Sequence, residues 1–159
     1  MAFASRFFRA ENLAAIMIFA CLSMLTGCSS FDHDWDAAAS AKPVGPTDMT
    51  GRWEGTWASD TDGHTGGLRC LITQTGTRTY HARYAATYGG MFHFNYEMDL
   101  EADPKFDWVT FTGSADLGAL AGGEYHYEGR ADSEKFYARY TSDADRGQFN
   151  MTRPEEGGK

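Results

Sequence analysis

The chain has 159 residues, a formal net charge of −8, and aromatic side chains at 14% of its positions. An acidic chain gains no attraction from phosphate backbones, so the composition argues against nucleic acid as a partner. Of the three cysteines, only Cys70 lies beyond residue 28. A domain formed after that point must therefore be stabilised by its hydrophobic core, because no intrachain disulfide is available to it.

The first residues have the pattern of an export signal. Residues 1–10 carry Arg6 and Arg9 and no acid, and an apolar run from Leu13 to Leu25 follows. A basic segment before a short apolar segment is typical of a signal peptide. The run has thirteen residues, whereas a membrane-spanning helix needs roughly 20. We therefore predict a signal helix within residues 1–27 rather than a permanent membrane span.

The end of that run, Leu25-Thr26-Gly27-Cys28, resembles the bacterial lipobox, in which an aliphatic residue and two small ones precede an obligatory cysteine. The resemblance implies that Cys28 becomes the first residue of the mature chain and carries acyl chains such as palmitate, which anchor the protein to a membrane of the bacterial envelope. By the same analogy, Ser29 favours the outer membrane. The alternative is an ordinary signal peptide with a chance cysteine.

Residues 28–48 contain alanine, proline and glycine, with no apolar periodicity that could be buried. This composition predicts a flexible tether. Within it, the cluster from Asp32 to Asp36, with His33, offers metal-type side chains, but it fits a solvated acidic spacer better. No metal ion or other cofactor is expected.

From Gly51 onward, short β-rich runs recur between Gly, Asp and Ser residues, and no three-turn helical stripe is present. Residues 49–154 therefore predict one β domain, and residues 155–159 a disordered tail. The expected strands are eight, at about 52–59, 67–75, 79–87, 92–101, 107–114, 124–130, 135–141 and 147–153.

Pairing of opposite residues supports antiparallel hairpins. Pairing 79–87 with 92–101 so that Tyr84 faces Tyr96 puts apolar side chains on one face and complementary charges on the other. For the next hairpin we expect Leu100 opposite Val109, around a turn at 103–106. One wet and one dry face along eight strands requires a sandwich or a barrel. Consecutive short hairpins favour a single eight-stranded antiparallel up-and-down barrel, whose closure removes exposed edges.

Gly51-Arg52-Trp53 at the start of the first strand and Arg153 at the end of the last resemble the signature of the calycins, the superfamily of lipocalins and avidins. The resemblance implies that Trp53 lies across one end of the barrel with Arg153 packed on it. Trp57 and the strand count look more like avidin, but no biotin-contacting residues match. Residues 122–129 resemble MORN repeats, for which an open meander would be the alternative fold.

The dry face is rich in aromatic side chains, and tyrosine hydroxyls inside a barrel must find partners. Eight strands enclose either a filled core or room for one small ligand. The candidate ligand-lining residues are Trp57, Tyr80, Tyr84, Tyr96, Tyr125, Tyr127 and Tyr140.

No nucleophile, base and orienting group converge in the pattern, so we expect no enzyme. The predicted function is non-catalytic binding of a small hydrophobic or aromatic ligand by a membrane-anchored envelope lipoprotein. The alternative is a protein-interaction module with a filled core, such as an envelope scaffold or an inhibitor of a secreted hydrolase. Its contact surface would begin with the loop at 115–123, which is apolar for a loop.

Overall fold

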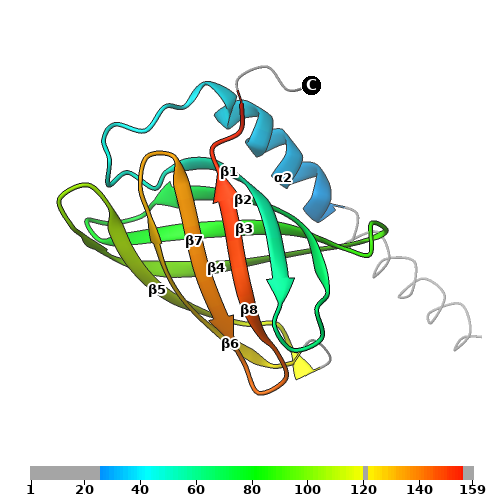
Figure 1. Ribbon diagram of the computed structural model, residues 1–159. Coiled ribbons are helices and arrows are strands. Elements are labelled where there is room, and N and C mark those ends of the chain that lie inside the picture. The colour runs from blue at the N-terminus through cyan, green and yellow to red at the C-terminus, as the bar shows by residue number, and fades with distance from the viewer. Residues whose placement is uncertain (1–25, 120–121, 156–159) are drawn as a thin grey trace, which may run out of the picture. The chain divides into compact units, whose positions relative to one another are not determined.

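The computed structural model describes residues 26–119 and 122–155 and shows a closed antiparallel barrel in which each strand pairs with the next and β8 returns to β1 (Figure 1). The predicted all-β meander barrel is confirmed. The open meander is excluded, because β1 and β8 pair from Glu54 opposite Thr152 to Ser59 opposite Gly147. The strands are β1 (Gly51–Ser59), β2 (Thr65–Gln74), β3 (Thr79–Tyr88), β4 (Phe92–Pro104), β5 (Val109–Asp116), β6 (Glu124–Ala131), β7 (Lys135–Thr141) and β8 (Arg146–Thr152).

The alternation of side chains explains why the sheet closes. In β7, Phe136, Ala138 and Tyr140 are buried, while Lys135 and Arg139 are exposed. Successive side chains of a strand point to opposite faces, so one face of every strand is apolar. Curling the sheet until β8 meets β1 buries that face against itself and leaves no unpaired edge.

The register of the β3–β4 hairpin is as predicted, with Tyr84 opposite Tyr96 and His81 opposite Asp99. The predicted β4–β5 register is wrong by four residues, because Leu100 lies opposite Gly113 and Pro104 opposite Val109. Strand β4 runs on to Pro104, and the chain turns at 105–108, where the Lys105 N–H donates to the Trp108 carbonyl at 2.7 Å. Because the shift is even, the same side chains still face inward.

The meander gives the barrel two distinct ends. At one end the chain enters β1 and leaves β8, and the connections at 75–78, 105–108 and 132–134 lie there; we call it the entry end. At the other end lie the connections at 60–64, 89–91, 117–123 and 142–145, which we call the mouth. The two ends have different contents.

Ahead of the barrel lie helix α2 (Thr26–Ala37) and the 3₁₀ helix η1 (Ala38–Ser40), neither of which the sequence pattern predicted. Trp35 is buried, and the guanidinium carbons of Arg52 and Arg69 each lie 5.3 Å from its ring centroid. These contacts hold Trp35 against outward side chains of β1 and β2. That residues 28–48 form a tether stays a prediction.

Residues 1–25, and with them most of the predicted signal helix, lie outside the described residues. Within the part of the chain that the structure describes, no helix has the length and apolar content to cross a membrane.

Candidate functional site

The entry end is closed by Trp53 and Arg153. Trp53 is fully buried, and the Arg153 guanidinium carbon lies 3.7 Å from its ring centroid. The indole Nε1–H donates to the Met49 carbonyl at 2.9 Å, so the ring is fixed from both sides. A cation over an indole face contributes ~0.5 to 2 kcal/mol, depending on how far it is desolvated.

The same guanidinium is in close contact with four backbone carbonyls and with Gly51. Gly51 has a φ of 95°, and a side chain there would come within 3.3 Å of Nη1 of Arg153. Burial lowers the pKa of Arg153 to about 10, which leaves the group charged at neutral pH. Its N–H groups donate to the carbonyls of Asp48, Thr50, Arg52 and Ser133 at 3.0, 2.6, 3.3 and 3.2 Å.

The middle of the barrel is filled. Tyr84 is buried, stacks on Tyr96 with centroids 4.9 Å apart, and shares a hydrogen bond with the Cys70 thiol. Burial raises the pKa of Cys70, so the thiol is protonated and unreactive. Tyr80, buried toward the entry end near Asp48, completes this part. Tyr80 and Tyr84, two of the predicted ligand-lining residues, thus belong to the filled core and are not among the residues that line the mouth pocket described below.

Above this core, the mouth holds a pocket with a volume of about 670 Å³. Aromatic residues make up nine of the sixteen residues that line it. The five other predicted lining residues are among them: Trp57, Tyr96, Tyr125, Tyr127 and Tyr140. Pockets of this size take a small organic ligand. The interior is therefore filled at one end and open at the other.

The pocket also contains residues that the sequence pattern did not predict: Tyr88, Phe92, Leu117, Asp62 and Asp145. Tyr88 and Phe92 have the inward parity of Tyr84 and Phe94. The expected third strand ended at residue 87, one residue before Tyr88, and Phe92 was the first residue of the expected fourth strand. Leu117 belongs to the loop at 115–123, which we had noted for its apolar content. Nothing local marks the two aspartates, because they come from separate turns.

Trp57 forms one wall of the pocket, and its ring lies beside the backbone of β2 and β3. Its Nε1–H donates to the Thr87 carbonyl at 2.8 Å, across from Gly66, the residue opposite Trp57 in β2. A Cβ on Gly66 would lie 1.8 Å from that carbonyl oxygen and 2.6 Å from the indole nitrogen. Only glycine leaves room for the ring at this position.

Three of the five tyrosine hydroxyls of the pocket are paired with protein groups. Tyr96 hydrogen-bonds Tyr127, and the Tyr140 hydroxyl donates to the Asp145 carboxylate at 3.1 Å. Burial raises the pKa of Tyr96, Tyr127 and Tyr140, with the charge of Asp145 adding to the shift at Tyr140. These phenols are neutral at physiological pH and offer hydrogen bonds rather than charge. Among the described side chains, no buried nitrogen or oxygen lacks a partner.

Two carboxylates supply the charge of the pocket. Asp145 accepts from the Ser59 hydroxyl at 2.7 Å, and Asp62 lies 2.7 Å from Nδ1 of His64. The His64 backbone N–H, followed by its side chain, lowers the pKa of Asp62 to about 2. Asp62 is therefore ionised at physiological pH.

The rim of the pocket is apolar and exposed on the side of the β3–β4 hairpin. Met91, Phe92 and Phe94 are 77%, 66% and 43% exposed. Phe94 lies opposite Ala86 in the β3–β4 hairpin, two residues from Tyr96. It has the inward parity, but it lies so near the end of β4 that no further layer covers it. The hairpin therefore presents apolar surface at the opening of the pocket.

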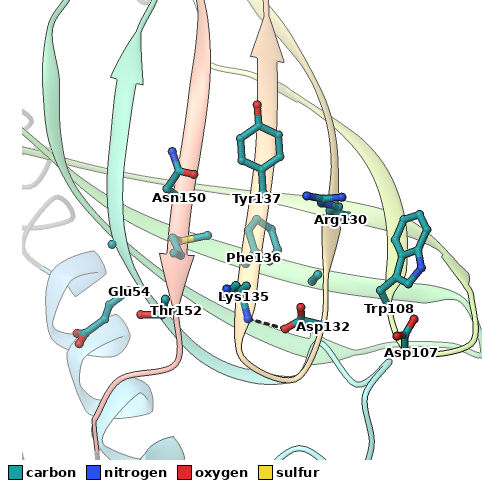
Figure 2. A pocket seen from close by; sticks show the side chains of 13 residues that line it. Glu54, Asp107, Trp108, Arg130, Asp132, Lys135, Phe136, Tyr137, Asn150 and Thr152 are labelled. Carbon is teal, nitrogen blue, oxygen red and sulfur yellow. Dashed lines mark hydrogen bonds between the residues drawn. The ribbon is translucent and has the colours of Figure 1, made fainter.

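A second hollow of about 670 Å³ lies on the outer face of the barrel (Figure 2). Figure 2 shows Trp108, Arg130, Tyr137 and Asn150 spread around it, and its lining carries both acidic and basic groups. The Lys135 N–H donates to the Asp132 carboxylate at 2.7 Å and holds the hairpin beside it. This lining has mixed charge and three aromatic residues, against nine in the mouth pocket.

Among residues 26–119 and 122–155, no three His, Cys, Asp or Glu side chains are grouped to hold a metal ion. Nδ1 of His81 lies 2.8 Å from Asp99 and Nε2 lies 3.5 Å from Glu97 on the outer face of β3 and β4. Comparison of the chain with family models, curated proteins and solved structures found no match. The mouth pocket is therefore the candidate site on the strength of its geometry.

Proposed function

We propose that the barrel binds one small hydrophobic or aromatic ligand in the mouth pocket, without catalysis. The observation that carries the proposal is the 670 Å³ hollow with nine aromatic lining residues above a filled core. A largely apolar cavity with a few fixed polar groups is the usual form of a small-molecule site. The Trp53–Arg153 stack at the entry end supports a relationship to the calycins, whose barrels bind ligands in this way.

The pocket is prepared for binding because its walls are held by other contacts. The Trp57 indole is tied to the Thr87 carbonyl, and the Tyr140 hydroxyl to Asp145. Side chains that are already ordered lose little entropy when a ligand arrives, which favours affinity.

A neutral fluorescent probe, N-phenyl-1-naphthylamine, tests the site. We expect it to bind and to quench the fluorescence of Trp57. Ala86→Leu, which adds volume at a lining position of β3, should weaken binding at least about tenfold. Ala85→Leu, on the next residue and the opposite face, is the matched control and should bind normally. Equal binding by both variants would place the probe elsewhere and remove the proposal.

We further propose that the chain is displayed on an envelope membrane through lipid on Cys28. The lipobox resemblance supports this, and several acyl chains at ~0.8 kcal/mol per buried CH₂ would anchor it stably. Cys28→Ala should abolish palmitate labelling and membrane fractionation in cells. Unchanged labelling would refute the anchor and leave the pocket proposal untouched.

The second candidate function is a protein-interaction module, which the exposed Met91 and Phe92 favour. Exposed apolar side chains gathered at one site often mark a contact surface. If a protein partner docks on this hairpin, Met91→Ser with Phe92→Ser should abolish its capture by crosslinking in cells. If capture persists, the hairpin is not the docking surface.

A further inference from the structure

The two ends of the barrel differ in charge. The mouth connections at 60–64, 89–91, 117–123 and 142–145 hold four aspartates and no lysine or arginine. The entry-end connections at 75–78, 105–108 and 132–134 carry Arg78 and Lys105 among their acids. Arg139 of β7 lies 3.2 Å from Asp60 and pairs with it, and the other three aspartates leave the mouth acidic.

Inside the pocket the imbalance continues. Among the described residues that line it, Asp62 and Asp145 are the charged ones, and none is basic. Asp145 accepts from neutral groups: the hydroxyls of Ser59 and Tyr140 and the backbone N–H of Arg146, at 2.7, 3.1 and 2.7 Å. These bonds orient the carboxylate and leave its charge uncancelled.

The aromatic lining adds to the same preference. An aromatic ring carries negative density on its faces, so a cation near several rings is stabilised, by ~2 kcal/mol or more where water is excluded. Trp57 stacks with Tyr88 at 5.9 Å and Phe94 with Tyr96 at 6.0 Å, so two pairs of stacked rings line the pocket. An anion would meet both the ring faces and the carboxylates unfavourably.

We propose that the ligand of the mouth pocket is an organic cation, an ammonium group on an apolar or aromatic body, held by the ring cluster with Asp62 and Asp145. This inference rests on the proposed ligand-binding function and names its chemical class. The apolar body lies against Leu68 and Phe149, and the ammonium group lies toward the carboxylates at the mouth.

Binding to the purified full-length chain is measured by calorimetry and tryptophan fluorescence with three probes of similar size: benzyltrimethylammonium, its neutral isostere neopentylbenzene, and the anion phenylmethanesulfonate. We expect the cation to bind at least about tenfold more tightly than the neutral isostere, and the anion most weakly. Added salt should weaken the binding of the cation and leave that of the neutral isostere unchanged.

Asp62→Asn and Asp145→Asn should each lower the affinity for the cation about threefold to tenfold and leave that for neopentylbenzene unchanged. If Asp145→Asn does not fold, Asp62→Asn and Phe94→Leu, which removes a ring but keeps apolar volume, carry the test. Asp107→Asn, in the turn at the entry end, is the matched control and should change neither affinity.

Neutral binding equal to or tighter than cation binding would overturn the inference while the proposed function stands. The same holds if both aspartate variants keep the preference of the unaltered chain. If neither benzyltrimethylammonium, neopentylbenzene nor the naphthylamine probe binds, the proposed function fails and this inference with it.

Discussion

Arg153 stabilises the fold more than a surface arginine does. Its guanidinium lies on Trp53 and donates to the carbonyls of Thr50, before β1, and Ser133, before β7. Hydrogen bonds to a charged group contribute about 1.5 to 3 kcal/mol, and the stack adds to them. We expect Arg153→Met to lower the free energy of unfolding by about 2 to 4 kcal/mol in urea denaturation. Arg153→Lys should recover little of this, since an ammonium lacks the planar fork.

The control for that experiment is Arg146→Met, at the start of β8, where the side chain is exposed. A change there should stay within about 0.5 kcal/mol. Equal losses for the two arginines would show that Arg153 has no special part in holding the entry end.

Cys70 gives a second prediction for a single residue. Its thiol is fully buried beside Tyr84, and burial raises its pKa, so both access and ionisation oppose its reaction. Alkylation should be slower than in the denatured chain by on the order of 10³-fold, because it must await unfolding. The rate is read on the tryptic peptide 70–78, apart from the other cysteines. Rapid native labelling would contradict the filled core.

Gly66 sets the shape of an element, because β2 can pass beside Trp57 only where it has no side chain. Gly66→Ala should break the bond from the indole to the Thr87 carbonyl, since a Cβ cannot lie 1.8 Å from that oxygen. We expect a loss of about 2 kcal/mol or more and weaker binding of the naphthylamine probe. Gly45→Ala, with nothing within 4 Å of its Cβ, is the control and should be neutral.

The strands were predictable where sequence alternation and turn agree. In the β3–β4 hairpin, pairing like side chains gives the observed register, because a shift of one residue would place charges opposite apolar residues. In the β4–β5 hairpin, Asp103-Pro104 has the composition of a type I turn, yet both residues belong to β4. Registers four residues apart bury the same faces, so alternation could not decide between them.

The site was predictable only in part for a similar reason. Parity identifies residues that face inward, which gave Trp57, Tyr127 and Tyr140. It does not say how deep each lies, and Tyr84 proved to be core rather than lining. The depth of a side chain inside the barrel depends on how the strand registers are staggered around it. The sequence of one strand does not contain that information. Trp35 was missed because the arginines that receive it lie on distant strands.

At the scale of the whole molecule, the barrel separates a closed, packed core from an open pocket. The entry end is closed by a charged stack and the middle by packed rings, so the mouth can remain open without loss of the core. Binding sites are commonly the less stable part of a fold. This arrangement also puts Asp48, which accepts from the backbone at the entry end, and the pocket carboxylates of Asp62 and Asp145 at opposite ends of the barrel.

That division leads to a prediction about acid. Burial opposes ionisation of Asp48, but hydrogen bonds from the N–H groups of Val44 and Thr50 outweigh it and lower the pKa below 3.8. The folded pKa lies below the unfolded one, so this group contributes stability above pH 3.8 that is lost as the pH falls through the folded value. Urea midpoints should fall between about pH 4 and pH 2, and Asp48→Asn should flatten that fall.

Because the Asp48 carbonyl also accepts from Arg153, acid should loosen the entry end before the mouth, seen as faster hydrogen exchange at residues 48–53. If Asp48→Asn leaves the dependence of the urea midpoint on pH unchanged, the acid sensitivity comes from other carboxylates.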